Sequence, residues 1–174
     1  GNHADLSGLW AVIHQTTSNL TFSRQHFSFI ARLMSNFTWT IRVYYEDTDA
    51  GGVVFYANYL KFFERARTEW LRAAGIGQFE MTENHGVMFV VKSTALDYHA
   101  PARLDNELKL TVVVEKLGRA SVQFMQEAWR TRADGTRELL ATGRIKVGCV
   151  DLVRFRPTEI PLHVLATIRD KETH

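Results

Sequence analysis

The sequence predicts an α+β fold in which one long helix is wrapped by a five-stranded antiparallel sheet. One stretch of helical period stands between one strand-like run before it and four after it. The connections between several of these later runs are short, and short connections require antiparallel neighbours. A single helix with a thick apolar face needs a sheet to cover it. A chain of 174 residues is long enough for one such domain.

The predicted helix extends from about Tyr56 to Ala74. Apolar side chains recur along it at spacings of three and four, while charged side chains fill the other positions. The apolar positions are Tyr59, Phe62, Phe63, Ala66, Trp70 and Ala73, and the charged ones are Lys61, Glu64, Arg65, Arg67, Glu69 and Arg72. Gly75 follows directly and is predicted to end the helix.

The five predicted strands are rich in aromatic and β-branched residues. They span residues 38–45, 87–98, 107–116, 120–132 and 139–150. In the run at 107–116 leucines and valines alternate with polar residues, which is typical of a half-buried strand. Asp134 and Gly135 predict a hairpin turn between the last two strands.

The composition predicts a soluble globular protein. Hydrophobic residues make up 45% and charged residues 23%, and a formal net charge of +2 gives no indication of nucleic-acid binding. No apolar stretch approaches the roughly 20 residues that span a bilayer. The lone Cys149 lies in an apolar run, so we expect it to be buried, and its lack of a disulfide partner within the chain fits a cytoplasmic location.

The organisation along the chain predicts one domain at residues 36–165. Residues 1–35 are rich in Ser, Thr, Asn and His without a sustained period, so we expect an extension that is either non-native or disordered. Met34 is a candidate native initiator because it stands just before the first strand. We expect residues 166–174 to form a C-terminal tail.

The segment EDTDAGG, residues 46–52, separates the first strand from the helix. Asp and Gly are favoured in turns, so the simplest interpretation is structural. However, the first turn of the predicted helix is apolar, which leaves unpaired backbone N–H groups in an apolar setting. Such a helix end attracts negative charge, including the oxyanion of an attacked carbonyl. Spacing alone leaves both interpretations open.

Several familiar chemistries are excluded by the sequence. It contains no G-x-S-x-G, no P-loop and no zinc-binding pattern. An EF-hand beginning at Asp47 would need an oxygen ligand at Gly51 and a glutamate at Asn58. An aspartate-nucleophile phosphatase would need a different residue at Gly51 and a later acidic pair. We therefore expect neither a metal nor a cofactor.

Two segments resemble a known family. The stretch RVYYEDTDAGGVVFYANYLKFFERARTEWLR resembles the hot-dog-fold acyl-CoA thioesterases of the 4-hydroxybenzoyl-CoA thioesterase family, most closely the branch encoded with the bacterial Tol-Pal system. The later segment DYHAPARLDNELKL is similar to the same branch, and the likeness covers about residues 36–160. The resemblance implies a hot-dog fold and hydrolysis of acyl-CoA to free acid and coenzyme A.

The resemblance implies two catalytic groups. The catalytic aspartate of the family falls on Asp49, which acts as nucleophile or as general base. The backbone N–H that polarises the thioester carbonyl falls on Tyr56. Many members of the Tol-Pal branch carry histidine at this position, but a backbone donor does not depend on the side chain.

The resemblance also implies residues that bind the substrate. Val54 and Asn58 match positions close to the acyl group, and Arg119 matches a basic position that contacts the coenzyme A phosphates. His99 replaces an aromatic residue of the branch pattern and is expected to alter the pocket.

The expected partners follow from the same resemblance. They are an acyl-CoA substrate, acyl carrier protein as an alternative carrier, and further copies of the chain in a homodimer or homotetramer. Two other functions remain open. One is a non-catalytic acyl-carrier or lipid-synthesis partner in envelope assembly. The other is a hot-dog dehydratase, which would use a histidine with an acidic partner.

Overall fold

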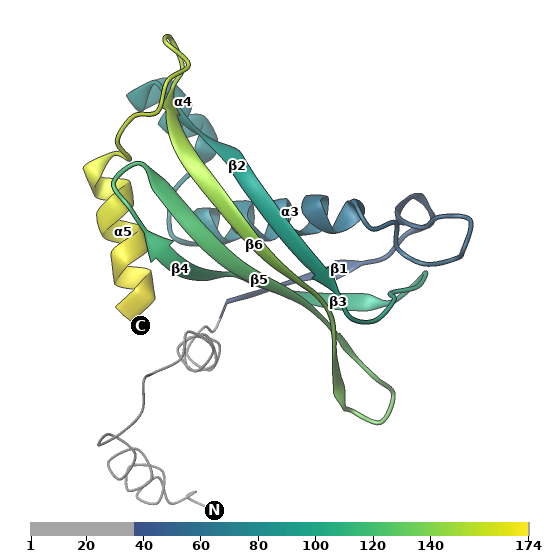
Figure 1. Cartoon of the computed structure of the whole chain (residues 1–174). Helices are drawn as coiled ribbons and strands as arrows, with labels where there is room; N and C mark the ends of the chain where they lie inside the picture. The colour runs from purple at the N-terminus through teal and green to yellow at the C-terminus, as the bar shows by residue number, and fades with distance from the viewer. Residues whose placement is uncertain (1–36, 174) are drawn as a thin grey trace, which may run out of the picture. The chain divides into compact units, whose positions relative to one another are not determined.

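The computed structural model describes residues 37–173 and shows one antiparallel sheet with a long helix packed against it (Figure 1). The predicted α+β hot-dog architecture is confirmed in this part of the chain, while the expectations for residues 1–35 lie outside the described residues. The helices are α3 (Asn58–Ala73), α4 (Gln78–His85) and α5 (Leu162–Thr173), with a 3-10 turn at Tyr45–Asp47.

The sheet has six strands, all paired antiparallel. They are β1 (Thr38–Arg42), β2 (Val87–Tyr98), β3 (Glu107–Thr111), β4 (Val113–Leu117), β5 (Ser121–Thr131) and β6 (Arg137–Asp151). Their order is β1-β3-β5-β6-β2, and β4 also pairs with β5. Strand β2 therefore forms one edge of the sheet. The side of β2 that faces away from β6 is unpaired among the described residues.

One predicted strand is two strands in the structure. The run at 107–116 divides into β3 and β4, which raises the number of strands from the predicted five to six. At the break the hydroxyl of Thr111 accepts the backbone N–H of Glu127 (3.0 Å), so a side chain takes the place of a ladder bond. The amide of Gln126 reaches the carbonyl of Thr111 (3.4 Å) at the same point. Val112, between the two strands, is buried.

Helix α3 begins two residues later than predicted and ends where Gly75 stops it. The N–H of Gly75 donates to the carbonyl of Arg72, and the N–H of Ile76 donates to that of Leu71 (both 2.9 Å). This pair of bonds is the Schellman motif, which requires a left-handed residue after the helix. Gly75 supplies it with a φ of +80°.

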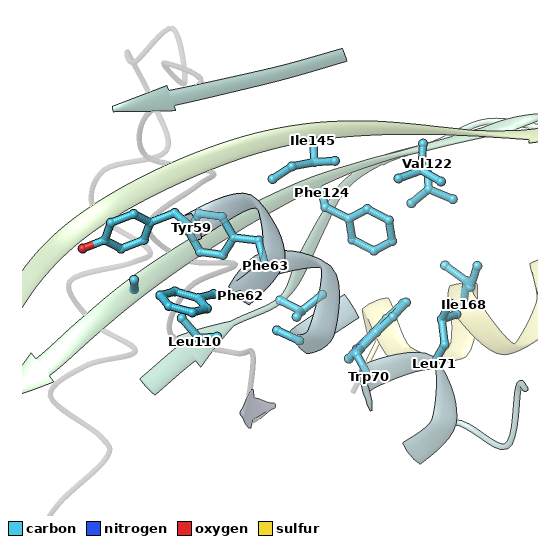
Figure 2. Packing of buried hydrophobic residues seen from close by; sticks show 14 of the residues in the cluster. Tyr59, Phe62, Phe63, Trp70, Leu71, Leu110, Val122, Phe124, Ile145 and Ile168 are labelled. Atoms are coloured by element: carbon cyan, nitrogen blue, oxygen red, sulfur yellow. The ribbon is translucent and has the colours of Figure 1, made fainter. Parts of the chain in front are cut away.

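The core lies between α3 and the sheet (Figure 2). Phe62 and Phe63 are almost fully buried, and Trp70 packs edge to face on Phe124 of β5 with ring centroids 5.6 Å apart. Phe63 packs very close to β6. A Cβ added to Gly143 of this strand would stand only 3.0 Å from the Phe63 ring. The apolar stripe predicted for the helix is confirmed except at Ala73, which is exposed.

Helix α5 begins before residue 166 and continues through most of the segment that was expected to be a C-terminal tail. Its residues Val164, Leu165 and Ile168 belong to the buried core. Burying three such side chains stabilises the fold by several kcal/mol, at about 1.5 to 3 kcal/mol each. Cys149 is fully buried as predicted, and burial raises the pKa of its thiol to about 11.

Candidate active site

The turn between β1 and α3 is held by backbone hydrogen bonds between residues 47–49 and residues 53–55. The N–H of Asp49 donates to the carbonyl of Val53, and the N–H of Phe55 donates to that of Asp47 (both 2.9 Å). Gly52 closes the tip by donating to the carbonyl of Asp49 (2.9 Å), with a φ of +72° that favours glycine. The turn predicted from EDTDAGG is confirmed.

The two aspartates of this turn have different environments. Asp47 is buried, its Oδ2 accepts the N–H of Tyr44, and its carbonyl accepts Nδ2 of Asn58 (both 2.9 Å). Asp49 is exposed, and its Oδ1 accepts the N–H of Gly51 (2.8 Å). Its Oδ2 has no hydrogen-bond donor among the described residues. Asp47 therefore holds the turn together, whereas Asp49 leaves one carboxylate oxygen exposed at the surface.

The start of α3, a few residues after this carboxylate in the same turn, offers free hydrogen-bond donors. The N–H groups of Tyr56 and Ala57 have no acceptor in the described part of the chain, and no side chain caps the helix. Asn58 donates its N–H back to the carbonyl of Phe55 (2.9 Å). Tyr56 lies in the turn just before the helix, and its carbonyl accepts the hydroxyl of Tyr98 (2.9 Å). Partial burial and the neighbouring Tyr56 raise the pKa of Tyr98.

The other residues predicted near the acyl group lie in or next to this turn. Val54 is buried and donates its N–H to the carbonyl of Ala102 (2.9 Å). Asn58 uses its side-chain amide to hold the carbonyl of Asp47. His99 directly follows Tyr98 in the sequence, and its Nε2 lies 3.0 Å from the hydroxyl oxygen of Thr142. Within residues 37–173, neither the Asn58 amide nor the His99 imidazole is paired with a carboxylate.

Arg119 lies at the other end of the sheet. It stands in the turn before β5, exposed and close to Ser121. Tyr98, whose hydroxyl donates to the carbonyl of Tyr56, pairs with Ala141, and Ala141 pairs with Ala128 of β5. Seven residues of strand separate Ser121 from Ala128, a distance of about 23 Å. Within one chain the structure brings Asp49, Tyr56, Val54 and Asn58 together and leaves Arg119 apart.

A cavity of about 210 Å³ lies along the C-terminal half of α3, away from Asp49. Its walls come from α3, α5 and strands β2, β5 and β6, and they include Leu71, Phe124 and Ile168. Arg67 also lines it, although only 8% of this residue is exposed. Its Nη1 donates to Oε1 of Gln126 (2.8 Å).

The burial of Arg67 was not predicted, because its sequence position placed it among the charged residues of the helix. Glu64, one turn earlier on the helix, does not pair with it and instead accepts the hydroxyl of Thr68 (2.8 Å). The partner of Arg67 is Gln126, 59 residues away on β5. A polar residue in the middle of the strand run VQFMQEAW was the only available signal for a buried polar contact.

Among residues 37–173 no group of three or more His, Cys, Asp or Glu side chains is arranged to hold a metal ion. In the same part of the chain, no helix combines the length and the apolar character needed to cross a membrane.

Comparison of the sequence with known proteins finds relatives over most of the domain. The profile of the thioesterase-like superfamily matches residues 43–168. The chain is 42% identical to the acyl-CoA thioesterase YbgC of Haemophilus influenzae over 134 residues, which covers 77% of this chain and 95% of that protein. It is 34% identical to the acyl-CoA thioesterase YbgC of Helicobacter pylori over 124 residues, covering 69% and 90% respectively.

Comparison of the structure finds the same fold in solved proteins. The 4-hydroxybenzoyl-CoA thioesterase from Pseudomonas sp. strain CBS-3 superimposes with a TM-score of 0.70 at 20% identity, covering 75% of this chain and 97% of that one. At this identity the likeness shows the fold alone. Together with the profile match and the relatives above 30% identity, it leads to one conclusion: this chain belongs to the thioesterase-like superfamily.

Proposed function

We propose that this protein hydrolyses acyl-CoA thioesters, with Asp49 as the catalytic carboxylate. The observation that carries the proposal is the exposed carboxylate of Asp49 in the same short turn as the unpaired N–H groups at the start of α3. The relatives named acyl-CoA thioesterase support this assignment. The resemblance of the D-x-D-x-G-G motif to the family's catalytic segment supports the choice of Asp49.

The geometry supplies the two elements that thioester hydrolysis needs. The carboxylate of Asp49 delivers the nucleophile, and the N–H of Tyr56 with the N-terminus of α3 stabilises the oxyanion that forms on the thioester carbonyl. Removing one such donor typically lowers kcat by about 100- to 1000-fold. The C–S bond breaks with departure of coenzyme A as a thiolate, which is a good leaving group, so no partner histidine is needed.

Two forms of the mechanism remain to be distinguished. In the first, Asp49 attacks the thioester carbon and forms a mixed anhydride, which water then hydrolyses. In the second, Asp49 removes a proton from water as the water attacks. A single turnover in ¹⁸O water with hydroxylamine trapping distinguishes them. Label in the Asp49 carboxylate, or a trapped acyl-Asp49 adduct, supports the anhydride. Label only in the released acid with no trapped adduct supports the general base, because water attacking the acyl carbon of an anhydride would also label the acid.

We also propose that subunits pair through the open edge of β2. The strand is long, with its second edge unpaired among the described residues, and an unpaired edge is a template for another strand. Antiparallel pairing of two β2 strands brings the end of the sheet that carries Arg119 next to the catalytic turn of the partner. This arrangement accounts for the wide separation of Arg119 and Asp49 within one chain. Further stacking of such dimers would give the expected homotetramer.

The free, buried Cys149 supports a cytoplasmic location. The resemblance supports association with the Tol-Pal system and coenzyme A as the acyl carrier. Acyl carrier protein is the alternative carrier, because it presents a thioester on the same type of pantetheine arm. Measuring kcat/KM with matched acyl-CoA and acyl-carrier-protein esters decides between the two carriers.

The test of the activity is the release of free thiol from acyl-CoA, followed with a thiol-reactive dye. We expect Asp49→Asn to lower kcat by at least about 100-fold while the fold is retained, because one positioned acid or base is typically worth that much. Glu83→Gln, which alters an exposed carboxylate on α4, is the matched control and should leave kcat unchanged. Full activity in Asp49→Asn contradicts the assignment, and no thiol release by the wild type supports the carrier-partner or dehydratase function instead.

A further inference from the structure

The cavity along α3 combines apolar walls with a single buried cation. Leu71, Val122, Phe124, Val147 and Ile168 are apolar side chains that line it, and all five are buried. Arg67 reaches it from α3. The exposed side chains of Glu64 and Val91 mark its mouth, on the side of the edge strand β2.

Arg67 has more hydrogen-bonding capacity than its described neighbours use. A guanidinium carries five N–H donors, and the structure shows one bond, from Nη1 to Gln126. Gln126 is itself held by donating to the carbonyl of Phe63 (3.1 Å). Nε and Nη2 of Arg67 make no hydrogen bond with the described residues, and Arg67 lines the cavity, so these donors are available to a bound group.

No ion pair formed by the described residues includes Arg67. The acid that affects the pKa of Arg67 is Glu64, which is exposed at the mouth of the cavity and accepts the hydroxyl of Thr68. Burial lowers the pKa of Arg67 to about 10, so the side chain remains a cation at neutral pH. A buried cation is favourable only when an acceptor or an anion compensates for its lost hydration.

The volume of the cavity limits which bound group can compensate for the lost hydration of Arg67. A cavity of about 150 Å³ with apolar walls binds a benzene molecule, and a heavy atom of water size takes about 30 Å³. The 210 Å³ found in this structure therefore accommodates about seven heavy atoms. That is too large for a single ion, and it matches a short acyl chain or a substituted ring.

We propose that this cavity receives the distal part of the acyl group and that Arg67 binds an oxygen at its end. The inference rests on the proposed thioesterase function and defines its substrate class. The enzyme then prefers acyl groups that end in a carboxylate or a hydroxyl over hydrocarbon groups of the same size. The carboxylate is favoured most, because it makes charge-assisted hydrogen bonds to a guanidinium.

The acyl group enters this cavity from the catalytic turn of the partner subunit. Arg67 is eleven residues beyond Tyr56, about 16 Å along the helix axis, and seven bonds of about 1.5 Å span at most about 11 Å. Within one chain the acyl group would therefore meet Arg67 only if the side chain left Gln126 and extended toward the turn. Phe89 and Val91 of the edge strand line the cavity. Antiparallel pairing of two β2 strands therefore brings this cavity close to the partner's catalytic turn.

The test compares three coenzyme A esters with seven heavy atoms beyond the thioester carbon. They are adipoyl-CoA, 7-hydroxyheptanoyl-CoA and octanoyl-CoA, and kcat/KM is measured for each with the full chain. A charge-assisted hydrogen bond is worth about a 10- to 100-fold change. We expect wild type to prefer adipoyl-CoA over octanoyl-CoA by at least about tenfold, with the hydroxy ester intermediate.

Substitution of Arg67 should reverse the preference. Arg67→Met removes the cation but keeps much of the volume, so octanoyl-CoA becomes the better ester. Arg67→Lys keeps a charge without the planar fork and should retain part of the preference. Arg65→Met, an exposed arginine on the same helix, is the matched control and should leave the ratio unchanged. An Arg67→Met variant that loses activity equally toward all three esters overturns the inference.

A binding measurement separates this inference from the proposed function. Thioether analogues of adipoyl-CoA and octanoyl-CoA cannot be hydrolysed, and their Kd values for wild type are obtained by calorimetry. Tighter binding of the adipoyl analogue without hydrolysis of any ester supports the cavity assignment and rejects the enzyme assignment. Hydrolysis of all three esters with equal kcat/KM and equal Kd values rejects the cavity assignment and leaves the enzyme assignment intact.

Discussion

The two halves of α3 serve different purposes and are built in different ways. At the N-terminal end, the turn that carries Asp49 is held mainly by hydrogen bonds among residues 44–58, with two further bonds from Ala102 and Tyr98. At the C-terminal half, side chains from α5 and strands β2, β5 and β6 close around Arg67. The comparison teaches that the proposed catalytic carboxylate is positioned mainly by neighbours in the sequence, whereas the cavity depends on residues far apart in the chain.

The largest expected effect on stability is at the C-terminal half. Ile168 of α5 is almost fully buried against α3 and the sheet, so Ile168→Ala leaves a cavity and should destabilise the fold by about 3 kcal/mol. Chemical denaturation measures this change. Leu162→Ala at the exposed start of α5 is the control and should change the free energy of unfolding by less than about 0.5 kcal/mol. Equal effects of the two substitutions would show that α5 is not packed as described.

A smaller loss of stability, combined with a loss of activity, is expected at the catalytic turn. Asp47→Ala leaves the N–H of Tyr44 without its acceptor and should cost about 2 kcal/mol of unfolding free energy. It should also lower kcat, because the turn that positions Asp49 loosens. Asp49→Asn, by contrast, should change stability by less than about 0.5 kcal/mol. Denaturation and thiol-release assays on both variants check this separation, and a strong destabilisation by Asp49→Asn would contradict it.

The smallest effect compares two glycines at opposite ends of α3. Gly52 and Gly75 both have a positive φ, and at both an added Cβ would meet nothing within 4 Å. Gly52→Ala and Gly75→Ala should therefore each cost about 1 kcal/mol, through backbone strain alone. Only Gly52→Ala should also lower kcat, because Gly52 closes the turn on Asp49. Similar kcat values for the two variants would show that the turn tolerates this strain without moving the carboxylate.

Elements with strong local signals could be predicted from the sequence. Strand β2 has the predicted bounds, Gly75 ends α3, and Gly135 adopts a φ of +83° in the predicted hairpin. The residues of the catalytic turn were also found, because glycines and aspartates mark a turn wherever it stands in a chain. The choice of Asp49 over Asp47 came from the family resemblance, and it stays a prediction.

The features that were missed depend on contacts between distant residues. The burial of Arg67 follows from Gln126 on β5, and the break between β3 and β4 follows from the bond of Thr111 to Glu127. Helix α5 was not predicted, because it contains only a few large apolar residues. The surface that these residues cover belongs to other elements of the fold. The separation of Arg119 from Asp49 depends on the pairing register of β2, β6 and β5, which no local pattern reveals.

The hydroxyl of Tyr98 has a consequence for regulation by assembly. Tyr98 ends the edge strand β2 and donates to the carbonyl of Tyr56, so one hydrogen bond ties the rim of the sheet to the backbone beside the reactive carboxylate. If subunits pair along β2 as proposed, the partner strand lies next to this hydrogen bond. We then expect dilution into separate chains to reduce turnover per molecule, which makes specific activity a readout of association.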